Sequence, residues 1–341
     1  MKKIRLGKTE IITPQNAFGA LPIQRVSVDA AVSLLRRAFE GGMTFFDTAR
    51  AYTDSEEKMG IALEGVRDKI FIATKTMAGT GDEMEKELEA SLKNLKTDHV
   101  DLYQLHCVQK CIRPGDGTGL YEALIRAKEQ GMINHIGITT HLIGVAEEIV
   151  QSGLYESLQY PFSYLASDRD IALVNACKEA DMGFIAMKGL SGGLLTDSRA
   201  CMAFMTQYDN VLPIWGIQRE NELDEWLSFF KEEAVLDEET KAVIEADRKE
   251  LSGDFCRGCG YCSPCTVGII INHCARISQM IRRMPSDVWL TDHWKNEMER
   301  VADCVDCGVC MTRCPYGLNI PYLLRKNLED YREIAAGRRS V

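Results

Sequence analysis

The sequence lacks the features expected of a protein that spans a membrane or binds nucleic acid. No apolar run approaches the ~18 residues of a membrane helix, and the basic start MKKIRLGKTE has no apolar stretch of signal-peptide length behind it. A formal net charge of −10, without a dense Lys/Arg cluster, would repel a phosphate backbone. We therefore expect a cytoplasmic protein that binds neither membrane nor nucleic acid.

Two cofactor signatures are also missing. No glycine-rich dinucleotide fingerprint opens the first helical segment, and GDGTG at 115–119 lies in a loop and is typical of a turn. No flavin site can be recognised, so nothing visible would divide a hydride into single electrons. Cysteine, by contrast, is abundant, with 13 residues. In a reducing compartment such thiols stay free or bind metal.

Short apolar runs alternate with amphipathic helical stretches between residue 16 and about residue 225. The eight strand candidates are 17–21, 44–48, 70–74, 100–106, 135–139, 157–160, 184–188 and 211–215. Strands that alternate with helices form βαβ units and a parallel sheet. Eight units predict an α/β fold, a closed (β/α)8 TIM barrel; the alternative is an open doubly wound sheet.

Two of the intervening stretches show clear helical patterns. The segment 27–42 carries apolar residues at helical spacing and ends on Gly41, a plausible C-cap. The segment 82–95 opens on Asp82 and Glu85, a capping-box pattern, and has one apolar face. That face consists of Met84, Leu88, Leu92 and Leu95.

Three of the predicted strands end on polar residues: Asp47, Lys75 and His106. Tyr52 lies in the loop after Asp47. Because consecutive parallel strands place their carboxyl ends side by side, these residues should converge. An ammonium beside a phenol is expected to lower its pKa, so Lys75 would make Tyr52 a better proton donor. Asp47 would hold Lys75, and His106 would orient a bound carbonyl.

With these residues in view, the first 225 residues resemble the aldo/keto reductase family. The resemblance rests on FFDTARAYTDSEEKMG, IATKT, YQLHC and HIGITTH, which occur in the family's order. It implies that Asp47, Tyr52, Lys75 and His106 form the catalytic tetrad and that NADPH supplies a hydride.

The same resemblance implies residues that contact the cofactor. Thr139 and Gln159 match residues that bind the nicotinamide carboxamide, and Phe162 falls where the family usually has a stacking tyrosine, although core packing is the alternative. Gly189 and Gly192, in GLSGG, follow the seventh strand, where backbone amides commonly bind phosphate; a loop that needs glycine dihedrals is the other interpretation.

The stretch after the eighth strand, GIQRENELDE, departs from the serine-rich sequence usual in the family. Arg219 is a candidate for the 2′-phosphate of NADP, and Glu222 aligns with a position that often touches adenine. NADP is therefore favoured over NAD.

Eight of the cysteines form two runs. The second run reproduces C-x2-C-x2-C-x3-C-P, the pattern of bacterial ferredoxins, and the first run differs from it by one residue. Zinc is the alternative, but a single ion does not need so many cysteines at this spacing. The ferredoxin pattern implies two crossed 4Fe-4S clusters. One would use Cys256, Cys259, Cys262 and Cys314, and the other Cys265, Cys304, Cys307 and Cys310.

The residues between the two runs are helical in pattern, which resembles helical ferredoxin modules, and aldo/keto reductases with such a module form a subgroup. We expect a barrel over 1–225, a helical connector over 226–250 and a small, mainly helical ferredoxin-like iron-sulfur domain with a C-terminal tail over 251–341. The apolar content of the last region predicts no independent core. The five cysteines outside the runs are expected to be packing residues or spare thiols.

Two functional hypotheses follow. In the first, the protein reduces an aldehyde or ketone with NADPH, or oxidises the alcohol, and the clusters are structural or sense oxygen. In the second, the clusters exchange electrons with an external ferredoxin or flavoprotein, and the barrel serves for docking or for a reduction by single electrons. A barrel that binds NADPH only as a regulatory ligand is a third possibility.

Overall fold

The computed structural model describes residues 1–251 and 255–339. The chain forms two compact units. The first comprises residues 1–189 and 198–241, and the second comprises 190–197 and 242–341. The loop 190–197 thus belongs to the C-terminal unit, although it is preceded and followed in sequence by residues of the first unit. None of the helices in the described part of the chain has the length and apolar character that crossing a membrane requires.

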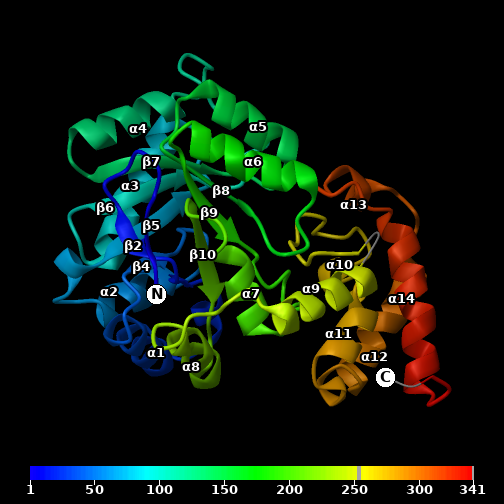
Figure 1. Cartoon of the computed structure of the whole chain (residues 1–341). Helices are drawn as coiled ribbons and strands as arrows, with labels where there is room; N and C mark the ends of the chain where they lie inside the picture. Colours follow the sequence, from blue (N-terminus) through cyan, green and yellow to red (C-terminus); the bar gives the residue numbers. More distant parts are fainter. Residues whose placement is uncertain (252–254, 340–341) are drawn as a thin grey trace. The chain divides into compact units, whose positions relative to one another are not determined.

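The N-terminal unit is a closed barrel of eight parallel strands, in the order β10-β3-β4-β5-β6-β7-β8-β9 (Figure 1). The strands are β3 (Ala17–Gly19), β4 (Phe45–Asp47), β5 (Phe71–Thr76), β6 (Val100–Leu105), β7 (Ile133–Thr139), β8 (Ser157–Pro161), β9 (Gly183–Met187) and β10 (Val211–Gly216). All eight predicted strands are present, and the prediction of a closed (β/α)8 barrel is confirmed. The alternative of an open sheet is wrong.

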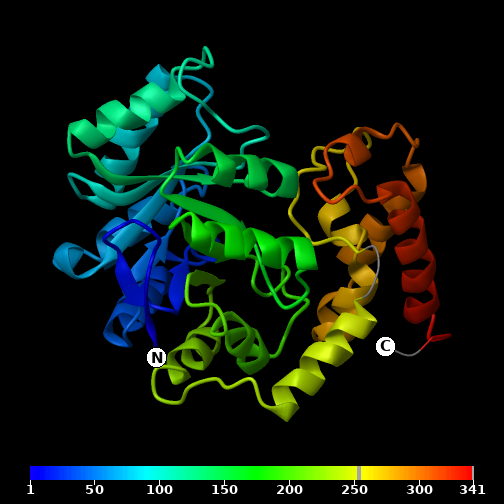
Figure 2. The ribbon, with the colours of Figure 1, turned by 45° about the horizontal axis from the view of Figure 1, so that its top comes forward.

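An α-helix follows each barrel strand, as the turned view in Figure 2 lets the reader trace. These helices are α1 (Val28–Glu40), α2 (Ser55–Ala62), α3 (Gly81–Leu95), α4 (Leu120–Glu129), α5 (Ile143–Ser152), α6 (Asp168–Glu179), α7 (Ser198–Met205) and α8 (Glu220–Ser228). Two short 3-10 turns, Pro22–Arg25 and Arg67–Lys69, lie in the connections.

Helices α1 and α3 correct details of the sequence interpretation. Gly41 is the C-cap of α1, as expected. The buried face of this helix consists of Ala31, Leu34, Leu35 and Ala38, whereas Val28, its first residue, is exposed. The apolar face of α3 is buried as predicted. Its N-cap, however, is Thr80, whose hydroxyl accepts a hydrogen bond from the Glu83 amide, so the capping box at Asp82 is wrong.

An N-terminal hairpin, which the sequence analysis did not predict, contributes to the barrel core. The antiparallel strands β1 (Lys3–Arg5) and β2 (Ile12–Pro14) carry Ile4 into a buried cluster together with Leu6 and Ile11. The other members of the cluster are barrel residues: Ala17, Phe45, Ala73, Leu102, Ile185, Leu212 and Ile214. Since most of these residues lie in the first half of their strands, the hairpin covers the end opposite to the strand carboxyl ends.

The C-terminal unit is mainly helical. Its elements are the end of α9 (Glu238–Glu250), then α10 (Ile271–Cys274), α11 (Ile277–Arg283), the 3-10 turn Ser286–Val288, α12 (Asp292–Glu299), the 3-10 turn Arg300–Asp303, α13 (Val309–Thr312) and α14 (Ile320–Ala335). Helix α14 packs on α10, α11 and α12. Asn327 fastens it, accepting a bond from the Ser278 amide and donating to the carbonyl of Ala275.

This unit has a small apolar core, contrary to the sequence expectation. Its buried residues include Ile271, Ile277, Met280, Ile281, Met298, Val301, Leu323, Leu324, Leu328 and Ile334. Several of them lie on α14, whose apolar face comes from a stretch that is largely separate from the cysteine runs. Burial of these side chains therefore contributes to the stability of this unit.

Candidate functional site

The barrel site begins with a buried ion pair at the carboxyl ends of β4 and β5. The ammonium of Lys75 lies 2.6 Å from Oδ2 of Asp47 and donates a second bond of 2.6 Å to the carbonyl of Thr48. Both side chains are almost completely shielded from solvent. Asp47 also accepts from the Gln104 amide at 3.4 Å. Burial raises the pKa of Asp47, while Lys75, Gln159 and Gln104 oppose the rise.

Tyr52 and His106 face this ion pair. The Lys75 ammonium is 5.3 Å from the centre of the Tyr52 ring, and the rings of Tyr52 and His106 meet edge to face at 5.7 Å. His106 directly follows β6 and is fixed by a bond of 2.8 Å from its amide to the carbonyl of Thr76. The structure therefore brings together all four residues that the sequence analysis selected.

The loop that carries Tyr52 is held by the other residues of the FFDTARAYTDSEEKMG motif. The Ser55 hydroxyl donates to the carbonyl of Ala20 at 3.0 Å. Glu56, at the start of α2, accepts from the Thr74 hydroxyl at 2.7 Å and pairs with Arg50. The buried Lys58 donates to two carbonyl groups of the 3-10 turn region. These polar residues act as scaffold, since each ties the Tyr52 loop to a neighbouring element.

The electrostatics of Tyr52 differ from the sequence expectation. Burial raises the pKa of Tyr52 well above its ordinary value, and Asp47 and Cys107 raise it further. Any lowering of this pKa by Lys75 is smaller than these effects, and the Lys75 ammonium is itself paired with Asp47. Tyr52 is consequently a neutral phenol over the whole ordinary pH range, with its proton available for donation.

His106 is also uncharged at neutral pH. Burial lowers its pKa to about 3, with further contributions from the positive charge of Lys75 and from His141. Its Nδ1 atom is buried without a hydrogen-bond partner among the described residues. A neutral imidazole can donate one hydrogen bond to a substrate oxygen without adding charge.

The predicted carboxamide contacts are Thr139, the last residue of β7, and Gln159 in β8, and the two are paired in register. Both are buried. The Thr139 hydroxyl accepts a bond of 2.7 Å from the Cys107 amide and keeps its own proton to donate. Oε1 of Gln159 is buried without a partner within the described chain. A free acceptor beside a free hydroxyl proton suits a carboxamide, which offers both a donor and an acceptor.

Two predicted cofactor residues have other roles in the structure. Phe162 is only 2% exposed and packs against the rings of Phe184, Phe204 and Tyr208. Phe162 is therefore packed in the core, and its stacking on the nicotinamide ring stays a prediction. The carboxylate of Glu222 accepts from the amides of Gln218 and Arg219, which caps the start of α8.

The remaining candidates lie on loops. Gly189 packs on the Trp215 ring, where a Cβ would be 2.7 Å from the nearest ring atom. Gly192 has φ +73° and needs the left-handed conformation. Arg219 is largely exposed, with Glu222 at 3.6 Å. A guanidinium in this position is accessible to a phosphate.

Cys107 belongs to the site, although the sequence analysis treated it as a packing or spare thiol. It is partly exposed, has φ +57°, and is close enough to Tyr52 to raise its pKa. Its position directly after His106 was the available signal. The other four cysteines outside the runs, Cys111, Cys177, Cys201 and Cys274, are buried, in agreement with packing.

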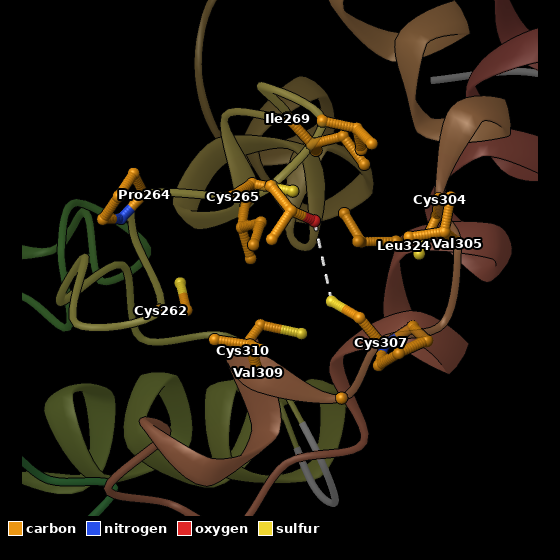
Figure 3. Close-up of a pocket in the computed structure, with 15 residues that line it drawn as sticks. Cys262, Pro264, Cys265, Ile269, Cys304, Val305, Cys307, Val309, Cys310 and Leu324 are labelled. Carbon is orange, nitrogen blue, oxygen red and sulfur yellow. Dashed lines mark hydrogen bonds between the residues drawn. The ribbon is translucent and has the colours of Figure 1, made fainter.

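In the C-terminal unit, Cys265, Cys304, Cys307 and Cys310 line one cavity. Figure 3 shows the sulfur atoms of Cys265, Cys307 and Cys310 turned into the space between them. Cys262 and apolar residues, among them Ile269, Val305 and Leu324, complete the wall. The Thr266 hydroxyl contacts the Cys307 sulfur at 3.6 Å. Four thiols in an apolar wall fit a 4Fe-4S cluster.

The other four cysteines of the runs also lie together. Burial raises the pKa of Cys262 to about 12, and Cys256, Cys259 and Cys314 contribute to the rise. The Gly258 amide donates to the Cys256 sulfur at 3.4 Å. Cys314, from the second run, is therefore near the first three cysteines of the first run. A bound iron cluster would remove the cost of crowding these thiolates because it supplies positive charge.

In the described residues, no group of three or more His, Cys, Asp or Glu side chains is arranged to hold one metal ion. The thiols surround spaces and do not converge on a point, as the cavity of Figure 3 illustrates.

Comparisons with known proteins agree with both units. The family model "Aldo/keto reductase family" matches residues 15–202, and the model "4Fe-4S dicluster domain" matches residues 255–319. The dicluster match decides between iron-sulfur and zinc in favour of iron-sulfur.

Curated relatives are similar over the barrel. The uncharacterized oxidoreductase YqkF of Bacillus subtilis is 29% identical over 213 residues, which cover 58% of this chain and 67% of the relative. The methylglyoxal reductase DkgB of Salmonella typhi is 36% identical over 142 residues, or 39% of this chain and 51% of the relative. The match thus spans about half the length of this methylglyoxal reductase.

Solved structures show the same fold. The aldo-keto reductase AKR11C1 from Bacillus halodurans, in its holo form, superposes with a TM-score of 0.62 at 21% identity, covering 72% of this chain and 96% of that one. An aldo-keto reductase from Klebsiella pneumoniae in complex with NADPH gives 0.61 at 20% identity, covering 72% and 94%. The chain therefore belongs to the aldo/keto reductase family and carries a C-terminal 4Fe-4S dicluster domain.

Proposed function

We propose that the barrel reduces an aldehyde or ketone with NADPH, or oxidises the corresponding alcohol. The observation that carries the proposal is the position of the Lys75 ammonium, 5.3 Å from the Tyr52 ring and 2.6 Å from Asp47, with His106 beside the same ring. Bound NADPH would supply a hydride to the carbonyl carbon. The proton for the carbonyl oxygen then has to come from the protein.

Tyr52 is the proposed proton donor. Its raised pKa keeps the phenol protonated until a substrate oxygen with developing negative charge accepts the proton. The nearby ammonium of Lys75 would stabilise the tyrosinate that remains, and Asp47 holds this ammonium in place. His106, which is neutral, would donate a hydrogen bond that orients the carbonyl. Hydride and proton together convert the carbonyl to an alcohol.

The residues proposed for NADPH are Thr139 and Gln159 at the nicotinamide carboxamide, the backbone at Gly189 and Gly192 at phosphate, and Arg219 at the 2′-phosphate. The buried free acceptor of Gln159 supports the first contact, and the exposure of Arg219 supports the last. NADP is preferred to NAD because a guanidinium suits a phosphate monoester. Small dicarbonyls are the first substrates to test, because some relatives are named methylglyoxal reductases.

The variant Tyr52→Phe tests this function. It removes one oxygen atom and the donated proton but keeps the ring, so turnover of carbonyl substrates should fall by about 10²–10⁴-fold while the Kd for NADPH stays within about twofold. Thr53→Ser, in the same loop, is the matched control and should keep its activity. Undiminished turnover by Tyr52→Phe would contradict the assignment.

We further propose two crossed 4Fe-4S clusters in the C-terminal unit. The first would be bound by Cys256, Cys259, Cys262 and Cys314, and the second by Cys265, Cys304, Cys307 and Cys310. The shared cavity of the second set supports this division, as does the proximity of Cys314 to the first set. Anaerobically purified protein should contain about eight iron atoms per chain. About four would contradict the second cluster.

Electron exchange with an external redox protein is the second candidate function. The observation that favours it is the exposure of Cys307 together with the apolar side chains of Val305 and Met311, which are 63% and 40% exposed. A cluster ligand at the surface would allow single electrons to leave or enter. If carbonyl turnover depended on chemically reduced clusters, this candidate would replace the first.

A further inference from the structure

Arg276 is a buried guanidinium that holds a loop of the C-terminal unit. The side chain is 5% exposed. Its Nη1 atom donates a bond of 3.0 Å to the carbonyl of Gly192, and its Nε atom donates to the carbonyl of Asn272 at 3.0 Å. Gly192 lies in the loop 190–197, which packs with this unit. Arg276 thus fixes the loop that directly follows β9.

The same guanidinium lies against the loop between Cys256 and Cys259. A Cβ on Gly258 would be 2.6 Å from Cζ of Arg276, so only glycine permits this approach. None of the ion pairs found among residues 1–251 and 255–339 includes Arg276. The thiolates of Cys256 and Cys259, once they bind a cluster, would supply negative charge beside this guanidinium.

Both loops are shaped around Arg276. Gly192 and Gly258 have φ values of +73° and +66°. A Cβ on Gly192 would be 2.6 Å from Nη1 of Arg276 and 3.1 Å from the carbonyl oxygen of Arg257. Two positive-φ glycines thus bring two backbone segments into contact with one charged group. A shift of the Arg276 side chain toward the loop of Gly258 would therefore change its contact with the loop of Gly192.

We propose that Arg276 couples the electron count of the first cluster to the affinity of the loop 190–197 for the diphosphate of NADPH. This inference rests on the proposed function, in which the backbone of this loop binds phosphate and Cys256 and Cys259 ligate the cluster. Arg276 is a positioning residue in this scheme, because it acts on the cofactor through Gly192.

The direction follows from charge. One electron taken up from a reduced ferredoxin or flavoprotein would add one negative charge to the cluster, and the dinucleotide itself would stay unchanged. The extra charge attracts the guanidinium toward the cysteine loop and weakens its bond to the Gly192 carbonyl, which loosens the loop. The reduced protein should therefore bind NADPH more weakly. Because linkage is reciprocal, bound NADPH should lower the reduction potential of the first cluster by the same factor.

The test uses the complete, cluster-loaded chain under anaerobic conditions. The Kd for NADPH is measured by calorimetry with the clusters oxidised and again after electrochemical reduction, and the potential is measured by EPR-monitored titration with and without saturating NADPH. We expect binding to be about tenfold weaker in the reduced state. A tenfold ratio corresponds to a potential shift of about 59 mV for a one-electron couple.

Variants separate the coupling from simple loosening of the loop. Arg276→Gln should lower the potential of the first cluster and bring the two Kd values to within about twofold of each other. Arg283→Gln is the matched control, because Arg283 donates to the carbonyl of Leu194 in the same loop at 2.8 Å but pairs with Asp247 and Glu250. It should weaken NADPH binding equally in both redox states. Arg276→Lys keeps the positive charge. It is the variant to measure if Arg276→Gln does not fold.

The outcomes distinguish this inference from the function on which it rests. Equal Kd values in both redox states of the unmodified protein, with an unmoved potential, would overturn the coupling and leave the reductase function intact. An absence of NADPH binding in either state would overturn both. A redox-dependent Kd that persists unchanged in Arg276→Gln, or that is lost in Arg276→Lys although the charge is kept, would overturn the assignment to Arg276.

Discussion

The barrel and the C-terminal unit balance their buried ionisable groups in different ways. In the barrel, the Lys75 ammonium meets the Asp47 carboxylate at 2.6 Å, and the buried Glu56 meets Arg50 and Thr74. In the C-terminal unit, the ionisable neighbours of the Cys262 thiol are other cysteine thiols, and burial raises the pKa of Cys262. The buried charges of the barrel site are balanced by protein groups, whereas the cysteines, by our proposal, are balanced by bound clusters.

The two units therefore differ in what stabilises them. The barrel strands, the N-terminal hairpin and the flanking helices enclose a continuous apolar core. The C-terminal unit has a smaller core around α14 and, by our proposal, two clusters that cross-link residues as distant in sequence as Cys256 and Cys314. Loss of iron should therefore affect the two units unequally.

The largest expected effect is that of iron removal. Anaerobic chelation should strongly increase amide hydrogen exchange in α14 and around the cysteines, because metal-stabilised modules commonly unfold without their metal. Exchange in the barrel strands should change little. Hydrogen exchange with mass spectrometry resolves the two units, and Cys177→Ala, which removes a buried barrel thiol, is the control for iron content. Equal loss of protection in both units would refute the difference.

Next in size is the breaking of the barrel ion pair. Lys75→Met leaves Asp47 buried without its counter-charge and should lower the free energy of unfolding of the barrel by about 3–5 kcal/mol. The double variant Asp47→Asn with Lys75→Met should be less destabilised than Lys75→Met alone. Denaturant unfolding monitored by the barrel tryptophans measures both. If the two variants are equally unstable, the pair does not act as a unit.

A smaller effect is expected for Asn327 in the C-terminal unit. Asn327→Ala removes its bonds to the Ser278 amide and the Ala275 carbonyl and leaves buried backbone groups unsatisfied, at about 1–3 kcal/mol. The loss should appear as faster exchange of α14 amides while carbonyl turnover in the barrel is unchanged. Exchange of α14 at the rate of the unmodified protein would show that the packing around Asn327 does not limit the stability of this helix.

The smallest expected effect is an absence of pH dependence. The pKa of His106 is lowered to about 3 and that of Tyr52 is raised, so neither group changes its charge at intermediate pH. The kcat/KM of the free enzyme should be flat between about pH 5 and pH 9. The same shift determines how the stability of the fold depends on pH. Below the ordinary pKa of histidine, His106 binds a proton in the unfolded chain but stays neutral in the folded chain. His106 thus favours unfolding increasingly as pH falls toward 3.

An inflection near the ordinary histidine pKa would contradict this account of His106. The comparison variant is His106→Gln, which keeps a hydrogen-bond donor but cannot titrate. If an inflection is present in the unmodified protein and disappears in His106→Gln, the imidazole is charged during turnover and its role is that of an acid.

The sequence was sufficient to predict the barrel because its signals are local. Each strand is a short apolar run, and the polar residues Asp47, Lys75 and His106 stand at the strand ends. The N-terminal hairpin was missed because its strands, KIR and ITP, contain no apolar run. The 4Fe-4S dicluster domain was predictable because the cysteine spacing carries that information directly.

What the sequence could not reveal depends on contacts between distant segments. The pKa of Tyr52 was predicted in the wrong direction because burial and the pairing of Lys75 with Asp47 are properties of the folded site. The packing of Phe162 depends on Phe204 and Tyr208, which are more than forty residues away. The grouping of the loop 190–197 with the C-terminal unit depends on Arg276, which no local pattern marks.

The most direct test of the central claim, that the barrel transfers a hydride without the clusters, is an anaerobic single-turnover experiment with NADPH and a small dicarbonyl. NADPH absorbance and cluster EPR are followed together. The account predicts that NADPH is consumed only when the carbonyl is present and that the clusters keep their oxidation state. Reduction of the clusters by NADPH without a carbonyl, or stable NADPH across a broad set of carbonyls, would contradict it.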